Sequence, residues 1–187
     1  MTQTDFFGAT LLPGLSAVDD FITEAEEAAL VAYIEAAELT PFRFQQWEGK
    51  RRTRSYGWHY DFETGAFGRT EALPAWLISI ADRAADAAGI ARGSIAQALL
   101  LSYGPGAGIG WHRDRPVFEH VIGISLGAAA TMRFRRRAGA KFDRFALPLV
   151  PRGLYHLDGE ARAEWEHSIV GVDRPRWSIT LRTLRAR

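Results

Sequence analysis

The sequence predicts a mainly β fold with flanking α-helices, in which two N-terminal helices pack on one face of a jelly-roll core (a double-stranded β-helix). Three observations predict this class. Short β-type runs, broken by Gly, Pro and Asp, fill the chain from residue 96 onward. Two stretches with helical spacing precede them. The 187 residues, 47% of them hydrophobic, suit a single domain over 1–187 with a sizeable core.

The first half of the chain predicts two helices. The first covers about 24–37, because Thr23-Glu-Ala-Glu26 is a capping-box sequence and apolar residues follow at helical spacing. The second starts at Pro74, since proline is tolerated at the first helical position, and ends before Gly89. Its predicted apolar face consists of Leu77, Ile78, Ala81, Ala84 and Ala85.

The second half predicts the strands of the core. They cover 97–103, 120–126, 131–137, 142–150, 154–157, 164–170 and 177–184. Neither a linker nor an internal repeat separates them from the first half. We therefore assign the core to 95–187, and the helices with an additional covering segment to 1–94.

The composition excludes several kinds of site and partner. The chain has no cysteine, so disulfides, thiolate metal sites and a cysteine nucleophile are excluded, and a metal would need His, Asp or Glu ligands. The sequence shows neither a signal-peptide pattern nor an apolar stretch of bilayer length, so we expect a cytoplasmic protein without membrane contact. No feature indicates an obligate protein partner. The formal net charge of +1 argues against broad, charge-driven binding of nucleic acid.

The basic residues are nevertheless clustered, within 50–54 and within 133–137. Such a strip on a nearly neutral protein favours modest, local binding of a polyanion. The alternative is a solvated, arginine-rich strand edge that discourages edge-to-edge pairing. Charge alone does not decide between the two.

A candidate metal site begins with His112-x-Asp114, which follows a strand-like run and a Gly-rich turn. Side chains at i and i+2 of an extended segment leave the same face, so an imidazole and a carboxylate converge there. His167 lies far downstream, and two histidines with one carboxylate are typical of non-haem Fe(II) oxygenases. A buried histidine bonded to a nearby aspartate is the alternative for the pair alone. The other histidines are interpreted as structural or covering residues: His59, His120 and His156.

The context of this pair resembles the AlkB family of Fe(II)- and 2-oxoglutarate-dependent dioxygenases. The family core, Tyr-x-Pro-Gly followed by His-x-Asp, is similar to 103–114. The Ile-Gly-Ile-Ser-Leu-Gly run at 122–127 resembles the next family strand, and Gly-Glu-Ala-Arg at 159–162 resembles the stretch before the distal histidine. The arginines that bound 176–182 match the family's paired arginines. The resemblance spans about 51–185, with four motifs in the right order.

The resemblance implies a complete set of cofactor residues. The Fe(II) ligands would be His112, Asp114 and His167, with open positions for 2-oxoglutarate and O₂. Arg176 would take the distal carboxylate of 2-oxoglutarate and Arg182 would lie near its metal-chelating end. The Tyr103 hydroxyl would also contact the cosubstrate. One departure is Leu101, which stands where the family usually has an asparagine that also binds 2-oxoglutarate.

The substrate is expected to meet the segment 44–62, which alternates basic and aromatic residues and resembles the family's nucleotide-recognition lid. A nucleobase must be single-stranded or flipped out and held between flat side chains before such an enzyme can reach it. The alternative is an ordinary β-hairpin whose aromatics belong to the core. The candidate substrate-binding residues are Trp47, Arg51, Trp58, Tyr60, Glu160 and Arg162.

Three functions are consistent with these residues. The first is oxidative demethylation of alkylated nucleobases in DNA or RNA, with nucleic acid as the substrate partner. The second is the same chemistry on a tRNA modification or a protein side chain, and Trp165-x-His167 resembles the family branch that hydroxylates tRNA. The third is a non-enzymatic relative that only binds, against which the intact ligand set and both arginines argue.

Overall fold

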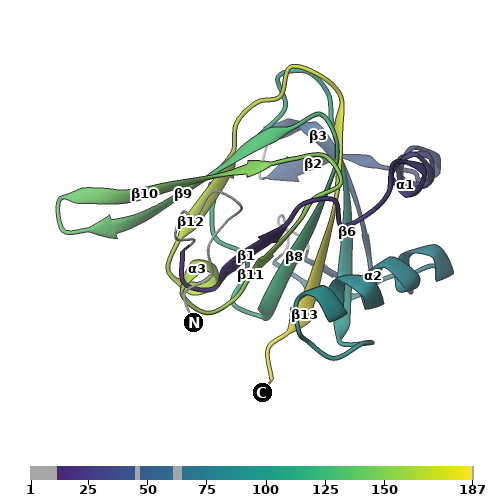
Figure 1. Ribbon diagram of the computed structural model, residues 1–187, viewed down its shortest axis with the longest axis horizontal. Coiled ribbons are helices and arrows are strands. Elements are labelled where there is room, and N and C mark those ends of the chain that lie inside the picture. The colour runs from purple at the N-terminus through teal and green to yellow at the C-terminus, as the bar shows by residue number, and fades with distance from the viewer. Residues whose placement is uncertain (1–11, 45–46, 61–64, 187) are drawn as a thin grey trace.

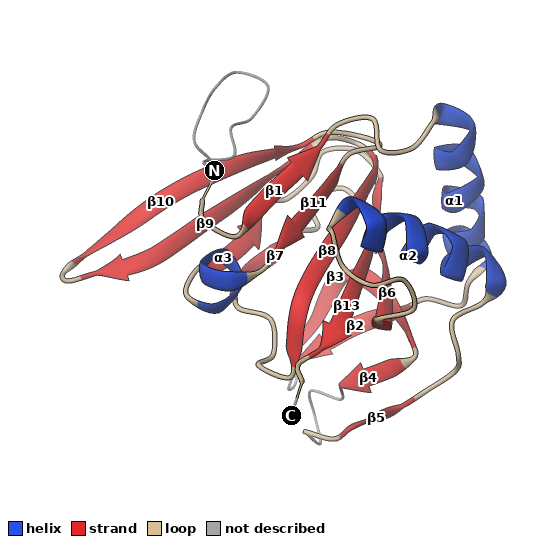
Figure 2. Ribbon diagram, turned by 60° about the horizontal axis from the view of Figure 1, so that its bottom comes forward, coloured by secondary structure: helices blue, strands red, loops and turns tan. Residues whose placement is uncertain are grey.

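The computed structural model describes residues 12–44, 47–60 and 65–186, and shows two facing β-sheets, a small ribbon and three helices (Figures 1 and 2). The larger sheet is antiparallel throughout. In spatial order its strands are β1 (Leu15–Val18), β11 (Leu154–Leu157), β8 (Phe118–Gly127), β13 (Arg176–Leu184), β6 (Ile95–Tyr103), β3 (Trp47–Tyr56) and β2 (Thr40–Phe44).

The smaller sheet closes the other side of the jelly roll. Its strands, in spatial order, are β10 (Lys141–Leu149), β9 (Ala130–Ala138), β12 (Glu166–Ile169) and β7 (Ile109–His112). The β9–β10 hairpin extends well beyond the body of the molecule (Figures 1 and 2). A separate ribbon pairs β4 (Trp58–Tyr60) with β5 (Phe67–Arg69). The predicted jelly-roll core is thus confirmed.

Both predicted helices are present. In α1 (Glu24–Ala36), the Thr23 side chain accepts from the Glu26 backbone while the Glu26 side chain accepts from the Thr23 backbone, which is the predicted capping box. Helix α2 (Ala75–Ala87) follows Pro74 as its N-cap, and a short α3 (Gly159–Ala163) precedes β12. None of the described helices has the length and hydropathy needed to cross a bilayer.

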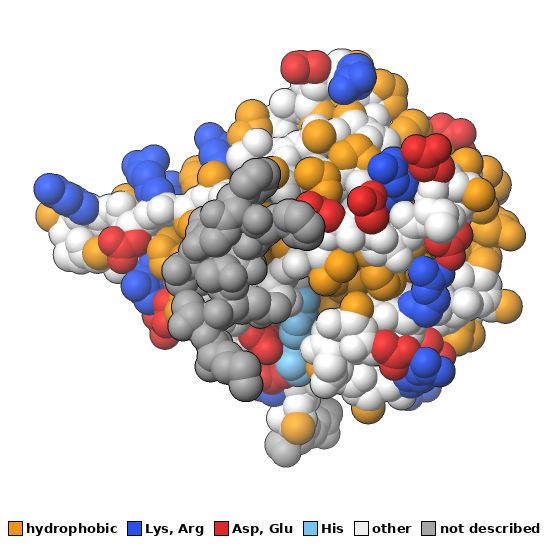
Figure 3. Space-filling view, viewed as in Figure 1, with side chains coloured by type: hydrophobic (Ala, Val, Ile, Leu, Met, Phe, Trp, Pro, Cys, Tyr) orange, Lys and Arg blue, Asp and Glu red, His pale blue; other side chains and the backbone are white. Residues whose placement is uncertain are grey.

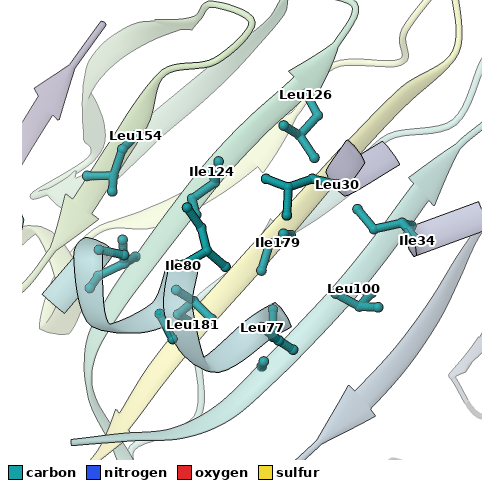
Figure 4. Close-up of a cluster of buried hydrophobic side chains, with 14 of the residues drawn as sticks. Leu30, Ile34, Leu77, Ile80, Leu100, Ile124, Leu126, Leu154, Ile179 and Leu181 are labelled. Carbon is teal, nitrogen blue, oxygen red and sulfur yellow. The ribbon is translucent and has the colours of Figure 1, made fainter. Parts of the chain in front are cut away.

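Helices α1 and α2 cover the outer face of the larger sheet and form the main core with it (Figure 4). Alternation along β8 turns Ile122, Ile124 and Leu126 toward the helices, and each fully buried aliphatic side chain contributes about 1.5–3 kcal/mol. One predicted core position is wrong: Ile78 is 48% exposed and Ile80 is buried instead. Ile80 completes the i, i+3, i+4, i+7 stripe from Leu77, whereas Ile78 lies about 100° around the helix from that residue.

The assignment of the core to 95–187 needs correction, because β1, β2 and β3 belong to the larger sheet. In particular, 47–56 is a strand of the central sheet paired with β6, and only the part that follows it forms a separate ribbon. The sequence pattern hid this strand because Arg51, Thr53 and Ser55 turn inward to a cavity, so no apolar alternation marks it.

Candidate active site

A cavity of about 1430 Å³ opens between the two sheets. Its wall on the larger sheet carries polar side chains from β3, β6 and β13, which project from the face opposite the helices. Its other wall is formed by β7, β12 and the loop after β7. The larger sheet is therefore apolar on the helix-covered side and largely polar on the cavity side.

The structure brings His112, Asp114 and His167 together at this cavity, with ligand atoms all within 4.8 Å of one another. Strand pairing does this directly, because His112 of β7 and His167 of β12 are cross-strand partners whose ring centroids lie 4.3 Å apart. Asp114 then follows two residues after His112. The predicted convergence of the His-x-Asp pair with the distal histidine is present in the structure.

Neighbouring groups direct the lone pairs of His112 and Asp114 toward the cavity, whereas Nδ1 of His167 is buried without a hydrogen-bond partner among the described residues. Nδ1 of His112 lies 2.9 Å from the Gly110 carbonyl oxygen, to which it can only donate, so Nε2 is left as the acceptor. One carboxylate oxygen of Asp114 accepts from Arg182, at 2.8 Å from Nε and 2.6 Å from Nη2. The other oxygen, Oδ2, lies 3.5 Å from Nε2 of His167, too far for a good hydrogen bond.

Arg182 is itself held in place by hydrogen bonds on the side away from Asp114. Its Nη1 donates to the side-chain oxygen of Gln97 at 2.8 Å, and the Gln97 amide nitrogen donates to the Trp58 carbonyl oxygen at 2.8 Å. Gln97 is only 4% exposed, so this relay from the ribbon to Asp114 is shielded from water. Arg182 was predicted to lie near the chelating end of the cosubstrate, and the structure places its guanidinium on the Asp114 carboxylate.

The local charges and burial keep Asp114 and His167 in the protonation states that bind metals. Burial alone would raise the pKa of Asp114, but the charges of Arg182, His167 and His112 hold it well below its usual range. Burial, with the neighbouring His112, lowers the pKa of His167 to about 3. Near neutral pH the site therefore offers a carboxylate and a neutral imidazole, the protonation states that a divalent metal requires.

This set fits Fe(II). Two imidazoles and one carboxylate on one side of a metal, with the remaining positions open to a cavity, are the facial triad of non-haem Fe(II) oxygenases. In the described part of the chain each ligand keeps at least one atom that no hydrogen bond occupies: Nε2 of His112, Oδ2 of Asp114 and Nε2 of His167.

A row of three side chains crosses the cavity wall on adjacent strands. Arg51 of β3 and Arg176 of β13 are each cross-strand partners of Tyr103 of β6, and all three line the cavity. Tyr103 and Arg176 are each 1% exposed, and the Arg176 guanidinium lies 5.4 Å from the Tyr103 ring centre. Two of the three residues assigned to 2-oxoglutarate, Tyr103 and Arg176, are thus adjacent.

The predicted substrate residues do not form one group. Tyr60 lines the cavity under the Arg115 guanidinium, which lies 3.9 Å from its ring centre. Trp58 lies outside the cavity lining and stacks on Phe67, with ring centroids 4.7 Å apart. The side chain of Trp47 lies outside the described residues.

The two candidates from the stretch before His167 also separate. Arg162 is 6% exposed, lines the cavity and donates to the carbonyl oxygens of Arg115 and Phe118. Glu160 is absent from the cavity lining and accepts instead from Arg136 at 2.7 Å. Arg162 therefore belongs to the cavity, whereas Glu160 anchors the β9–β10 hairpin.

Sequence reasoning missed one feature of the site and one outside it. Gln97 was included in a predicted strand without a role, although its even spacing from Leu101 and Tyr103 places it on the cavity face. His120 and His156, interpreted as unconnected, meet at 3.0 Å between Nδ1 and Nε2 and lie close to Asp158. Only strand pairing between β8 and β11 brings these two histidines together, so no local spacing could have shown it.

Comparison with known proteins agrees with this geometry. The sequence profile of the 2OG-Fe(II) oxygenase superfamily matches residues 14–185. The mouse tRNA (carboxymethyluridine(34)-5-O)-methyltransferase ALKBH8 is 29% identical over 165 residues, covering 85% of this chain and 24% of that protein. An Arabidopsis thaliana protein named alkylated DNA repair protein ALKBH8 homolog is 30% identical over 184 residues, covering 84% of this chain and 51% of that protein. The chain thus spans only a quarter to a half of the length of these relatives.

Solved structures show the same fold. The structure of OsALKBH1 superposes with a TM-score of 0.73 at 14% identity, covering 94% of this chain and 99% of that one. A Pseudomonas putida prolyl-4-hydroxylase superposes with a TM-score of 0.62 at 17% identity, covering 93% and 94% of the two chains. With the family profile and the ALKBH8 relatives, these findings confirm the resemblance drawn from the sequence. The chain belongs to the 2OG-Fe(II) oxygenase superfamily, and the ALKBH8 proteins are the relatives it resembles in sequence.

Proposed function

We propose that this chain oxidises a modified base of a nucleic acid, with His112, Asp114 and His167 as the Fe(II) ligands. The observation that carries the proposal is the position of these three groups at a cavity of about 1430 Å³. A cavity for one small ligand typically measures about 300–1,000 Å³, so this one has room for a cosubstrate and a nucleobase together.

The surface beside the cavity suits a polyanion. Arg133 and Arg135 lie over the Trp111 ring at 5.2 and 4.4 Å, and Arg135 and Arg137 lie over the Phe142 ring at 5.0 and 5.7 Å. The arginines and Phe142 belong to the protruding hairpin and Trp111 to β7 of the same sheet, and basic side chains are seen on the hairpin in Figure 3. Arg135 also pairs with Glu166 at 2.6 Å. Arginines that pair with phosphates, beside rings that stack on bases, are typical of single-stranded nucleic-acid surfaces.

Each residue has a defined task in the proposed reaction. Fe(II) with 2-oxoglutarate and O₂ supplies the oxidation of a C–H bond that no protein side chain could oxidise. Arg182 holds the Asp114 carboxylate so that one oxygen faces the cavity. Tyr60 offers a flat surface on which a flipped base can stack, and buried Arg162 carries positive charge to the same cavity. For an N-methylated base, the hydroxymethyl product would release formaldehyde.

A tRNA substrate is the second candidate, favoured by the ALKBH8 relatives, the first of which is named as a tRNA methyltransferase. Release of succinate and of formaldehyde separates the candidates when methylated single-stranded DNA, methylated RNA and tRNA are offered with Fe(II) and 2-oxoglutarate. Formaldehyde released with DNA or RNA supports demethylation, and succinate without formaldehyde, stimulated by tRNA, supports hydroxylation. Succinate that none of the three stimulates would reject a nucleic-acid substrate. Asp114→Ala is the blank.

A further inference from the structure

Arg51 occupies a place that the lid interpretation of 44–62 did not foresee. It belongs to β3 in the central sheet, where Tyr103 of β6 is its cross-strand partner, and Tyr103 in turn pairs with Arg176 of β13. All three side chains line the cavity. Strand pairing therefore places the two arginines on either side of a single tyrosine, and the Arg51 guanidinium lies over the Phe42 ring of β2, 3.7 Å from its centre.

Neither guanidinium is neutralised by the protein. No acidic side chain in the described part of the chain forms an ion pair with Arg51 or Arg176. The Nε atoms of both residues are buried without a hydrogen-bond partner among those residues. Burial lowers the pKa of both arginines. Arg176 is 1% exposed and Arg51 is half-buried. Cations held there without a counter-charge are costly, so this end of the cavity suits an anion.

By the resemblance drawn from the sequence, the same wall lacks a hydrogen-bond donor at position 101. Leu101 stands in place of the family's usual asparagine, is 3% exposed and lines the cavity two residues before Tyr103. Its cross-strand partners are Thr53 and Ser178, so β3 and β13 surround a position that itself cannot donate a hydrogen bond. Arg51 lies on β3 at the next cavity-facing position from Thr53, beside Tyr103.

We propose that Arg51 is a second arginine for the distal carboxylate of 2-oxoglutarate, acting with Arg176 across Tyr103 and offsetting the donor lost at Leu101. Two forked guanidinium groups can each present paired N–H donors to one carboxylate. The site would then select 2-oxo acids that carry a second carboxylate and reject those that end in a methyl group. This inference rests on the cosubstrate of the family and is independent of the nucleic-acid substrate.

Anaerobic binding of 2-oxo acids to the Fe(II)-loaded protein tests the proposal without turnover. The visible charge-transfer absorption of chelated Fe(II) reports binding of 2-oxoglutarate and of 2-oxopentanoate, which has the same carbon chain and no distal carboxylate. We expect Arg51→Gln to weaken 2-oxoglutarate binding about 10- to 100-fold, the range for a charged hydrogen-bonded contact. Binding of 2-oxopentanoate should stay within about twofold, so the discrimination between the two acids collapses.

Arg54→Gln is the matched control, since Arg54 lies on the opposite face of β3 and pairs with exposed Glu71. It should leave both affinities unchanged. Arg51→Lys keeps the charge without the fork, and we expect it to retain part of the discrimination; it is measured in parallel in case the glutamine variant does not fold. Equal weakening of both acids would overturn the proposal in favour of a structural role. Unchanged 2-oxoglutarate binding with weakened oligonucleotide binding would instead assign Arg51 to substrate phosphate.

Discussion

In the described part of the chain, two clusters of two histidines and one aspartate lie on opposite sides of the larger sheet. The inner cluster, which faces the cavity, consists of His112, Asp114 and His167. The outer cluster, on the side that carries the helices, consists of His120, His156 and Asp158. Both clusters bring their ligand atoms within 4.8 Å of one another. They differ in how their lone pairs are used, and this difference separates a metal site from a structural contact.

In the inner cluster, groups outside it engage the competing atoms of His112 and Asp114, whereas Nδ1 of His167 is buried without a hydrogen-bond partner among the described residues. The Gly110 carbonyl oxygen accepts a hydrogen bond from Nδ1 of His112, and Arg182 donates to one oxygen of Asp114. In the outer cluster the histidines bond to each other, at 3.0 Å from Nδ1 of His120 to Nε2 of His156. One nitrogen of that pair must donate and the other accept, so both lone-pair positions between the rings are occupied. Residue type and proximity are thus insufficient to make a metal site. Neighbouring groups must also hold the side chains so that their free lone pairs face the cavity.

Replacing the aspartate in each cluster should give the largest contrast. Asp114→Ala should reduce Fe(II) affinity by more than about 100-fold and abolish succinate formation, since it removes a ligand rather than one of its supports. Asp158→Ala should leave both within about twofold. Isothermal titration with Mn(II) in place of Fe(II) measures metal affinity, and a succinate assay measures turnover. Equal losses in the two variants would contradict the assignment of the metal to the inner cluster alone.

The support of the inner cluster should matter nearly as much as its ligands. Arg182→Gln removes both donors to the Asp114 oxygen and frees that carboxylate to turn, so we expect a 10- to 100-fold loss of metal affinity, the usual effect of outer-shell partners. Arg185→Gln, one residue after the end of the same strand, removes a cavity-lining arginine that pairs with Glu119 and does not contact Asp114, and is the control. Metal affinity that is unchanged in the Arg182 variant would show that the ligands need no such support.

The two aromatic residues of β4 extend the contrast between cavity and exterior. Tyr60→Ala should weaken turnover of a nucleic-acid substrate about 10-fold through lost stacking, while uncoupled 2-oxoglutarate consumption is unchanged. Trp58→Ala should instead lower the melting temperature, because Trp58 stacks on Phe67 outside the cavity. Kinetics and thermal unfolding of both variants decide this, and a Tyr60 variant that lost both activities equally would assign Tyr60 to the core.

The smallest expected effect concerns pH and the outer cluster. Burial lowers the pKa of His156 from 6.5, and neighbouring His120 lowers it further while Asp158 opposes the shift. The folded state favours neutral His156, so its contribution to stability is complete above pH 6.5 and is lost as the pH falls below that value. His156→Gln should flatten this dependence of the unfolding free energy by less than about 1.4 kcal/mol per pH unit. Denaturant unfolding between pH 7 and 5 measures it, and parallel curves for both proteins would contradict the assignment.

Much of the fold and of the metal site could be predicted because the signals are local. The capping box at Thr23 fixed the start of α1, and His112 with Asp114 share a face through their spacing alone. The role of Arg51 could not be predicted, because its neighbours Tyr103 and Arg176 come from strands far away in the sequence. The contact between His120 and His156 was hidden for the same reason.

The number of metal ions bound per chain tests the central claim most directly. Metal-free protein is dialysed anaerobically against Fe(II), and bound iron is counted for the unaltered chain and for Asp114→Ala. We expect one Fe(II) per chain in the first and none in the second, because among the described residues only the inner cluster keeps free ligand atoms that face one point. Two ions per chain, or one that survives the loss of Asp114, would contradict it.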